Sequence, residues 1–194
     1  MLTLPPTLHL TPSQFAEVCA ANPEAVLELE ADGTLIEMTP TGGSTSARNS
    51  ALLFQLQAWA RISGDWIVFD SSGGFRLPDG SVRSPDASVV RLDRWRALSE
   101  AERDGFPPLC PDLVVELASP SDQPEVLRRK MASYFTNGAR LGWLLLPRPR
   151  TVEVWRAPAS TSEAPFTELS DASQLEAGAE FPGLVINPEE IWAV

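Results

Sequence analysis

Two carboxylates stand where the surrounding sequence would bury them. Asp86 follows residues 84–85 (Ser-Pro) and enters the segment 87–90, and Glu116 interrupts the apolar run 113–117. Charged side chains are almost never fully buried without a partner. If the two segments are neighbouring strands, both carboxylates can converge at one end of a sheet and hold Mg²⁺, which takes a few carboxylates and several waters. Taken singly, Asp86 also fits a turn after proline, and Glu116 fits an ion pair on an edge strand.

Lys130 is the third candidate, because it is the only lysine in a chain whose 15 basic residues are otherwise arginine. A compact ammonium on a flexible stem can orient an attacking water, whereas a guanidinium is planar and bulkier. Helical spacing places Leu127, Met131 and Tyr134 on a buried stripe, with Lys130 beside it and Arg129 pointing away. The pattern predicts that Lys130 reaches the sheet edge; the alternative is a lysine at the core boundary with its ammonium in solvent.

Other reaction classes lack the residues that they need. The only histidine, His9, lies next to proline-rich sequence, so a Ser-His-Asp or Cys-His site would depend on one poorly anchored residue. A structural zinc site needs four closely grouped ligands, and His9, Cys19 and Cys110 are far apart. No glycine-rich loop ends in Lys-Ser or Lys-Thr, which disfavours nucleotide-driven chemistry. A site that works through carboxylates is therefore the class of chemistry that remains.

The N-terminal half predicts a helix, a hairpin and a long helix. Thr11-Pro12 supplies an N-cap and first turn for a helix over 11–21. Segments 26–30 and 34–38 flank Asp32-Gly33, a pair that favours a tight antiparallel hairpin. After the loop at 40–43, apolar residues recur at helical spacing through Trp59.

The remaining chain alternates strands and helices. Segments 66–70, 73–77 and 86–91 predict strands, and 92–111 is a polar stretch without a predicted element. Further expected elements are a buried strand at 113–117, a helix capped by Ser121-Asp122 that runs to about Phe135 and stops at Asn137-Gly138, strands at 141–146 and 151–156, a Ser-, Ala- and Glu-rich loop, and a closing segment ending at Trp192. Strand, helix and strand in succession predict a right-handed parallel crossover, so the chain is of the α/β class.

Length and composition favour one domain over residues 1–194, with 1–22 as an N-terminal arm and helix. The start of the chain shows no basic segment followed by an apolar one, so we expect a cytoplasmic protein with reduced cysteines. The longest apolar run, around 141–146, is far shorter than the roughly 20 residues that cross a bilayer, so we expect no membrane association.

The net charge of -11 argues at first against nucleic acid, which is usually bound by clustered Lys and Arg. The charge is unevenly distributed, however. Residues 1–60 and 151–194 together hold 14 acidic and 2 basic residues, whereas 61–150 hold 12 acidic and 13 basic residues. Nearly all the positive charge is therefore central, although an ordinary acidic surface explains the same numbers.

The candidate residues and their surroundings resemble the Uma-two family (domain of unknown function 820) of restriction-endonuclease-like proteins. The resemblance runs from about residue 24 to the C-terminus. It rests on the stretches 69–78, 82–88, 111–117 and 119–122, on Lys130-Met131 followed by Tyr134 and Gly138, and on Pro182-Gly183.

The resemblance implies a PD-(D/E)XK nuclease fold, a mixed central sheet flanked by helices, and a homodimer. It also implies an Asp, a Glu and a Lys around a divalent ion, here Asp86 and Glu116 as metal ligands with Lys130. Glu28 resembles a further family acid that binds metal or activates water. In the general motif the lysine lies two residues after the glutamate, a position held here by Ala118. Lys130 must therefore reach in from the following helix.

Together these features predict hydrolysis of DNA phosphodiester bonds with Mg²⁺ or Mn²⁺. Arg48, Arg76 and Arg83 are candidates for phosphate contacts, and simple solvation explains each equally well. Two alternatives stay open at this point: a family member that binds nucleic acid or protein without cutting it, and a structural or oligomerisation module. The target sequence and the choice between DNA and RNA are not encoded in any recognisable motif.

Overall fold

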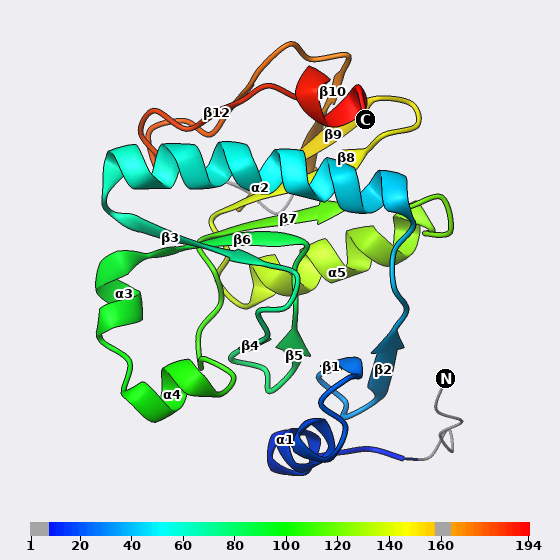
Figure 1. Ribbon diagram of the computed structural model, residues 1–194, viewed down its shortest axis with the longest axis vertical. Helices are drawn as coiled ribbons and strands as arrows, with labels where there is room; N and C mark the ends of the chain where they lie inside the picture. The colour runs from blue at the N-terminus through cyan, green and yellow to red at the C-terminus, as the bar shows by residue number, and fades with distance from the viewer. Residues whose placement is uncertain (1–7, 158–163) are drawn as a thin grey trace.

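A six-stranded mixed sheet forms the centre of the molecule (Figure 1). The structure is a computed structural model that describes residues 8–157 and 164–194. The strands, in the order β10-β9-β8-β7-β6-β3, are β3 (Trp66–Asp70), β6 (Ala87–Arg91), β7 (Leu113–Leu117), β8 (Leu141–Leu146), β9 (Thr151–Arg156) and β10 (Phe166–Ser170). Strands β7 and β8 are parallel and the other neighbours are antiparallel. Residues 1–7 of the predicted N-terminal arm and 158–163 of the predicted polar loop lie outside the described residues.

Two helices cover opposite faces of this sheet: α2 (Gly43–Ser63) on one side and α5 (Pro124–Thr136) on the other (Figure 1). Strand β7 shows how the faces are divided, because successive side chains of a strand point to opposite faces. Leu113, Val115 and Leu117 pack in the core cluster that includes Leu52 and Leu56 of α2. Val114 packs instead with the cluster of α5. By the same alternation, Glu116 faces α5.

The predicted crossover is present as β7, α5 and the parallel strand β8. The helix begins at Pro124 with Gln123 at its N-cap, so the cap predicted at Ser121-Asp122 is wrong. Asp122 instead accepts a hydrogen bond from the Ser119 amide at 2.7 Å and closes the preceding turn. Past the helix, Gly138 has a φ of 104°, which suits glycine and ends the element as predicted.

A smaller four-stranded sheet carries the N-terminal hairpin beside the central sheet. Its strands, in the order β2-β1-β5-β4, are β1 (Val26–Leu29), β2 (Leu35–Met38), β4 (Phe75–Arg76) and β5 (Val82–Arg83). The turn uses Gly33 at a φ of 87°, where a Cβ would lie 2.7 Å from the Leu10 carbonyl oxygen. Helix α1 (Pro12–Ala21) packs on this sheet through Phe15, and Thr11 caps it as predicted.

Several short elements differ from the prediction. The stretch 92–111 contains the helices α3 (Leu92–Arg96) and α4 (Glu100–Asp104), and the strand expected over 73–77 is reduced to β4. Elements β5, β10, β11 (Leu175–Glu176) and β12 (Val185–Ile186) were not predicted, and the closing segment forms α6 (Glu189–Trp192). Within the described parts of the chain, no helix has the length and apolar character needed to span a membrane.

Candidate active site

Strands β6 and β7 bring the two predicted carboxylates to neighbouring positions. The strands are antiparallel neighbours, with Ala87 opposite Val115, so Asp86 at the start of β6 lies beside the end of β7. The Asp86 Oδ2 accepts a hydrogen bond of 2.8 Å from the Leu117 amide, next to Glu116. Asp86 is thus fixed to the strand that carries the second carboxylate.

Lys130 joins two acidic side chains from different sheets. Its Nζ lies 3.0 Å from the Glu116 Oε1 and 3.0 Å from the Glu28 Oε1. It also lies 3.4 Å from the backbone carbonyl oxygen of Ser84. Only 11% of the Lys130 side chain is exposed, so its ammonium is directed into the site and not along the core boundary into solvent. The four predicted site residues therefore occupy one region, between β1, β6, β7 and α5.

The Glu28 carboxylate contacts Arg83, Ser84 and Lys130. Its Oε1 accepts a hydrogen bond of 2.8 Å from the Ser84 amide, and its Oε2 accepts one of 3.2 Å from the Arg83 guanidinium. Arg83 also pairs with Glu30, and 7% of its side chain is exposed. The prediction that Arg83 is available to contact phosphate is therefore wrong, because its charge is already shared between two carboxylates.

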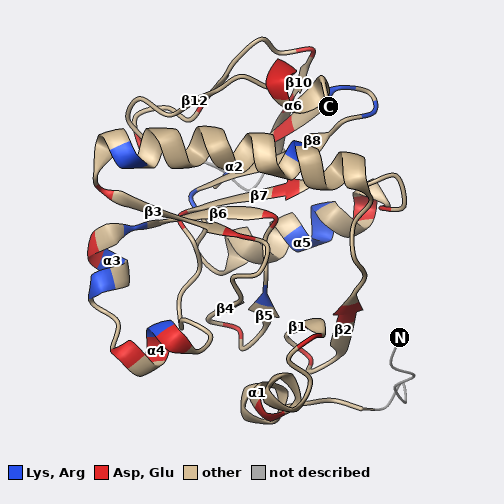
Figure 2. Ribbon diagram, in the orientation of Figure 1, with Lys and Arg blue, Asp and Glu red and all other residues tan. Residues whose placement is uncertain are grey.

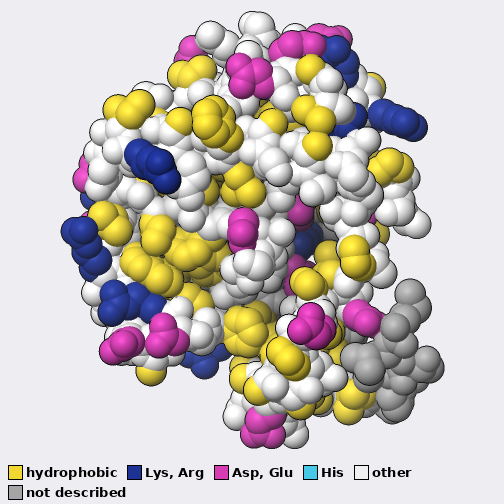
Figure 3. Space-filling view, viewed as in Figure 1, with side chains coloured by type: hydrophobic (Ala, Val, Ile, Leu, Met, Phe, Trp, Pro, Cys, Tyr) yellow, Lys and Arg dark blue, Asp and Glu magenta, His cyan; other side chains and the backbone are white. Residues whose placement is uncertain are grey.

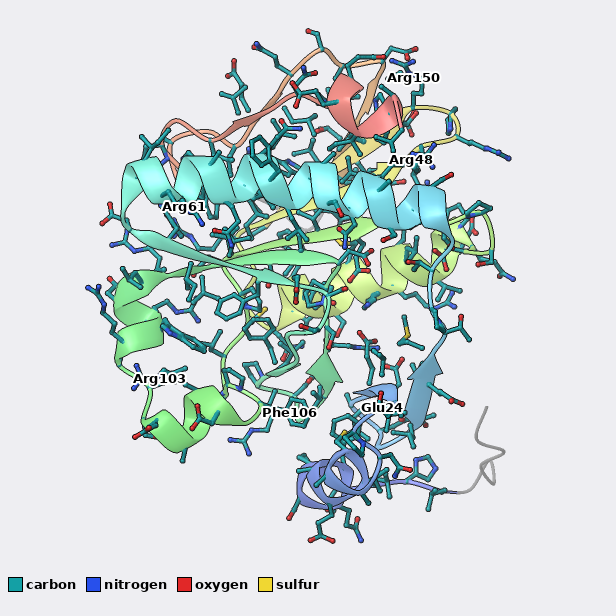
Figure 4. All side chains as sticks on the ribbon, viewed as in Figure 1. Glu24, Arg48, Arg61, Arg103, Phe106 and Arg150 are labelled. Atoms are coloured by element: carbon teal, nitrogen blue, oxygen red, sulfur yellow. The ribbon has the colours of Figure 1, made fainter. Side chains whose placement is uncertain are left out.

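The other two arginines considered for phosphate contacts lie elsewhere. Arg48 donates to the carbonyl oxygen of the C-terminal Val194 at 2.9 Å, and Figure 4 labels it on α2. Arg76 is exposed on β4 in the smaller sheet. In the part of the chain that the structure describes, neither arginine forms a hydrogen bond or ion pair with Asp86, Glu116 or Lys130, so their phosphate contacts remain predictions.

Burial and the neighbouring opposite charges shift the pKa values of the site residues in opposite directions. Burial raises the pKa of Glu116 to about 7, although Lys130 acts to lower it. Burial also raises the pKa of Asp86, against the effects of the Leu117 amide and Lys130. Burial by itself would lower the pKa of Lys130, but Glu116 and Glu28 raise it above its ordinary value. Lys130 is accordingly a cation at neutral pH.

The comparisons with known proteins assign the family. The model of the Uma2 family, described as "Putative restriction endonuclease", matches residues 12–189. The chain belongs to the Uma2 family. A solved structure from Anabaena variabilis, described as "a putative nuclease belonging to DUF820", covers 95% of this chain and 98% of its own at 19% identity, with a TM-score of 0.75. A search of the curated proteins found no match.

These findings confirm the predicted family resemblance and the mixed, helix-flanked sheet of a restriction-endonuclease-like fold. At this level of identity, the likeness to the solved structure concerns the fold alone. The family description names nucleases, which is the class of function predicted from the sequence.

In this Uma2 chain, the lysine beside Glu116 comes from a helix. At the usual position, Ala118 is half-buried, and its amide donates to the Leu145 carbonyl oxygen at 2.9 Å. Lys130 approaches the same glutamate from α5, which packs on the face to which Glu116 points. The amine is therefore close to the carboxylate although the sequence spacing differs from the general motif.

Two contacts of the Uma2 site were not predicted. The Tyr134 hydroxyl donates to the Glu116 Oε1 at 2.8 Å, whereas the sequence indicated only a buried core residue. The Asn49 amide of α2 donates to the Asp86 carbonyl oxygen at 3.2 Å. A signal for the first contact was present, since Tyr134 follows Lys130 by one helical turn and is the only tyrosine of the chain.

The donor set of the Uma2 site fits a hard divalent cation. Among the residues that the structure describes, no group of three His, Cys, Asp or Glu is arranged to hold a metal. Mg²⁺ does not require such a cage, because one or two carboxylates suffice when waters and substrate phosphates complete the coordination. Asp86 and Glu116 are an oxygen-only pair of this kind, without the sulfur or imidazole ligands that favour zinc.

Proposed function

We propose that the chain is a divalent-metal-dependent endonuclease that hydrolyses phosphodiester bonds of DNA. The observation that carries the proposal is the position of the Lys130 Nζ, 3.0 Å from both the Glu28 and the Glu116 carboxylates. A buried ion pair is costly to assemble, and this one fixes a cation beside Glu116, one of the two proposed metal ligands. Membership of the Uma2 family, whose description is "Putative restriction endonuclease", supports the reaction class.

The proposal gives each carboxylate a different task. Asp86 and Glu116 would hold Mg²⁺ or Mn²⁺, which when bound polarises a phosphate and lowers the pKa of a water. Glu28 accepts hydrogen bonds from Ser84 and Arg83 and pairs with Lys130, so its proposed task is to position the ammonium.

Lys130 would act as a fixed positive charge. Because its pKa is raised by Glu116 and Glu28 against the effect of burial, it is not a general base at neutral pH. Its ammonium can donate hydrogen bonds to a phosphate oxygen or orient the attacking water as negative charge develops.

The face shown in Figure 3 has a hollow between the β1–β2 hairpin and the central sheet, with acidic and basic side chains visible inside it. In the proposal, a substrate reaches the region between β1 and α5 through this hollow. The resemblance also favours a homodimer, which sedimentation equilibrium can test.

Nicking of supercoiled plasmid in Mg²⁺ or Mn²⁺ tests the proposal. We expect Lys130→Ala to lower the rate by at least about 100-fold, because charge stabilisation in the transition state is lost. The matched control is Arg129→Ala, which removes an exposed cation from the adjacent position of α5 and should leave the rate within about twofold. Equal nicking by wild type and Lys130→Ala would contradict the proposed site.

Calorimetric titration with Mg²⁺ separates the remaining alternatives. Binding that is lost in Asp86→Ala, together with an absence of nicking, would identify a member that binds without cutting. A wild-type protein that neither binds metal nor nicks would instead favour a structural or oligomerisation module.

A further inference from the structure

The two oxygens of the Glu116 carboxylate have different surroundings. The Oε1 accepts a hydrogen bond of 2.8 Å from the Tyr134 hydroxyl and lies 3.0 Å from the Lys130 Nζ. Among the described residues, the Oε2 has one hydrogen bond, a longer contact of 3.3 Å to the same Nζ. The Oε1 is therefore occupied by two donors, whereas the Oε2 can still accept a hydrogen bond or bind a cation.

Tyr134 is built into the core in a way that fixes this contact. Its side chain is fully buried, in the cluster that contains Met131 and Val114. It lies one turn beyond Lys130 on α5, so the hydroxyl and the ammonium approach Glu116 from the same helix. A packed aromatic ring has little rotamer freedom, so the hydroxyl holds the carboxylate in one orientation.

We propose that Tyr134 is a positioning residue that occupies the Oε1 and makes Glu116 offer its Oε2 alone to a divalent ion. This inference rests on the proposed role of Glu116 as a metal ligand. Single-oxygen binding suits the compact octahedral geometry of Mg²⁺, whereas Ca²⁺ readily accepts a carboxylate through both oxygens. Tyr134 thereby favours Mg²⁺ over Ca²⁺ at this site.

Calorimetric titration of Tyr134→Phe with Mg²⁺ and with Ca²⁺ tests the assignment. We expect the Kd for Mg²⁺ to rise about tenfold and the Kd for Ca²⁺ to change by less than about twofold, so the ratio of the two changes. A merely structural role would not change this ratio.

The matched control is Trp155→Phe. The Trp155 Nε1 donates to the Glu153 Oε2 at 3.2 Å, so this variant also removes a buried donor to a carboxylate, in the same core cluster. It lies outside the metal-ligand pair and should leave the Mg²⁺ and Ca²⁺ affinities unchanged. Unchanged affinities in Tyr134→Phe, or an equal loss for both ions, would overturn the assignment.

A second measurement uses the wild-type protein and does not depend on the folding of a variant. Because the chain has one tyrosine, labelling tyrosine with ¹³C at Cζ gives a single NMR signal from Tyr134. We expect this signal to shift on Mg²⁺ addition with the calorimetric Kd, and to stay fixed in Asp86→Asn. A constant signal while calorimetry records binding would overturn the role of Tyr134 alone. An absence of metal binding in wild type would overturn the proposed function as well.

Discussion

At the scale of single residues, the site combines the carboxylates of Glu28, Asp86 and Glu116 with two buried or nearly buried cations. These cations are Lys130 and Arg83. Glu28 and Glu116 are 2% and 3% exposed, and Arg83 is 6% exposed. Such a cluster is stable only because the charges are paired and most oxygens accept hydrogen bonds. Burial still disfavours the charged form of Glu116, and it raises the pKa of this residue to about 7. The stability of the protein should therefore depend on the protonation of this residue.

Replacing Glu116 with Gln tests this dependence. The folded pKa of Glu116 lies above its ordinary value of 4.5, so the folded state holds the proton more tightly than the unfolded chain. The resulting stabilisation is fully present below pH 4.5 and is lost as the pH rises to about 7. Relative to Glu116→Gln, wild type should lose on the order of 1–3 kcal/mol of unfolding free energy between about pH 5 and about pH 8.

Urea unfolding followed by tryptophan fluorescence over this pH range measures the difference. The exposed Glu176→Gln serves as the control and should follow wild type at every pH. A constant difference between wild type and Glu116→Gln would show that Glu116 ionises alike in the folded and unfolded states.

The sequence was informative about residues whose type conflicts with their surroundings. Asp86 and Glu116 interrupt segments that belong to buried strands, and Lys130 is the only lysine, so each could be singled out without a structure. Glu28 lacked such a signal and came only from the family resemblance. The buried pairing of Arg83 depends on Glu28 and Glu30, which are more than 50 residues away, so local sequence gave no indication of it.

At the scale of elements, the site depends on the close approach of α5 to β8. Gly142 of β8 makes this approach possible, because a Cβ there would lie 2.4 Å from the Met131 Cε and 2.9 Å from the Phe135 Cε2. Met131 follows Lys130 directly in the helix and is fully buried. A larger residue at position 142 would therefore push on the helix that carries Lys130 and Tyr134.

Gly142→Ala should lower the free energy of unfolding by about 1–3 kcal/mol, because the added methyl overpacks the core between β8 and α5. Urea denaturation measures the change, with Gly43→Ala as the control. A Cβ at Gly43 meets nothing within 4 Å, so that variant should be neutral or slightly stabilising. Equal stability of Gly142→Ala and wild type would mean that α5 can move away at no cost.

Long elements were predicted well and short ones were not. The 21 residues of α2 and the 13 of α5 repeat the helical spacing several times, and β7 and β8 form uninterrupted or nearly uninterrupted apolar runs. Helices α3 and α4 have five residues each, too few for a period to be recognised. The capping box between Ser99 and Glu102 was the available signal for α4. Strands of two residues are set by their neighbours in the sheet and not by their own sequence.

At the scale of the whole molecule, the proposed function requires an acidic protein to bind an acidic polymer. The net charge is -11, and Figure 2 shows most of the Lys and Arg on α3, α4, α5 and the segment after β8. The site itself adds negative charge, since Lys130 and Arg83 pair with three carboxylates, those of Glu28, Glu30 and Glu116, and Asp86 adds a fourth. Without a divalent ion, the field at the site should therefore repel a phosphate.

This charge balance predicts that DNA binding depends on the metal. A phosphorothioate duplex that resists cleavage should bind at least about tenfold more tightly in Mg²⁺ than in EDTA at equal ionic strength, as followed by fluorescence anisotropy. In Asp86→Asn, which removes one negative charge and one proposed ligand, the affinity in EDTA should rise and the gain on adding Mg²⁺ should be lost. Equal affinity of wild type with and without Mg²⁺ would contradict this, because the phosphate would then be held by the arginines of the surface and not at the carboxylates.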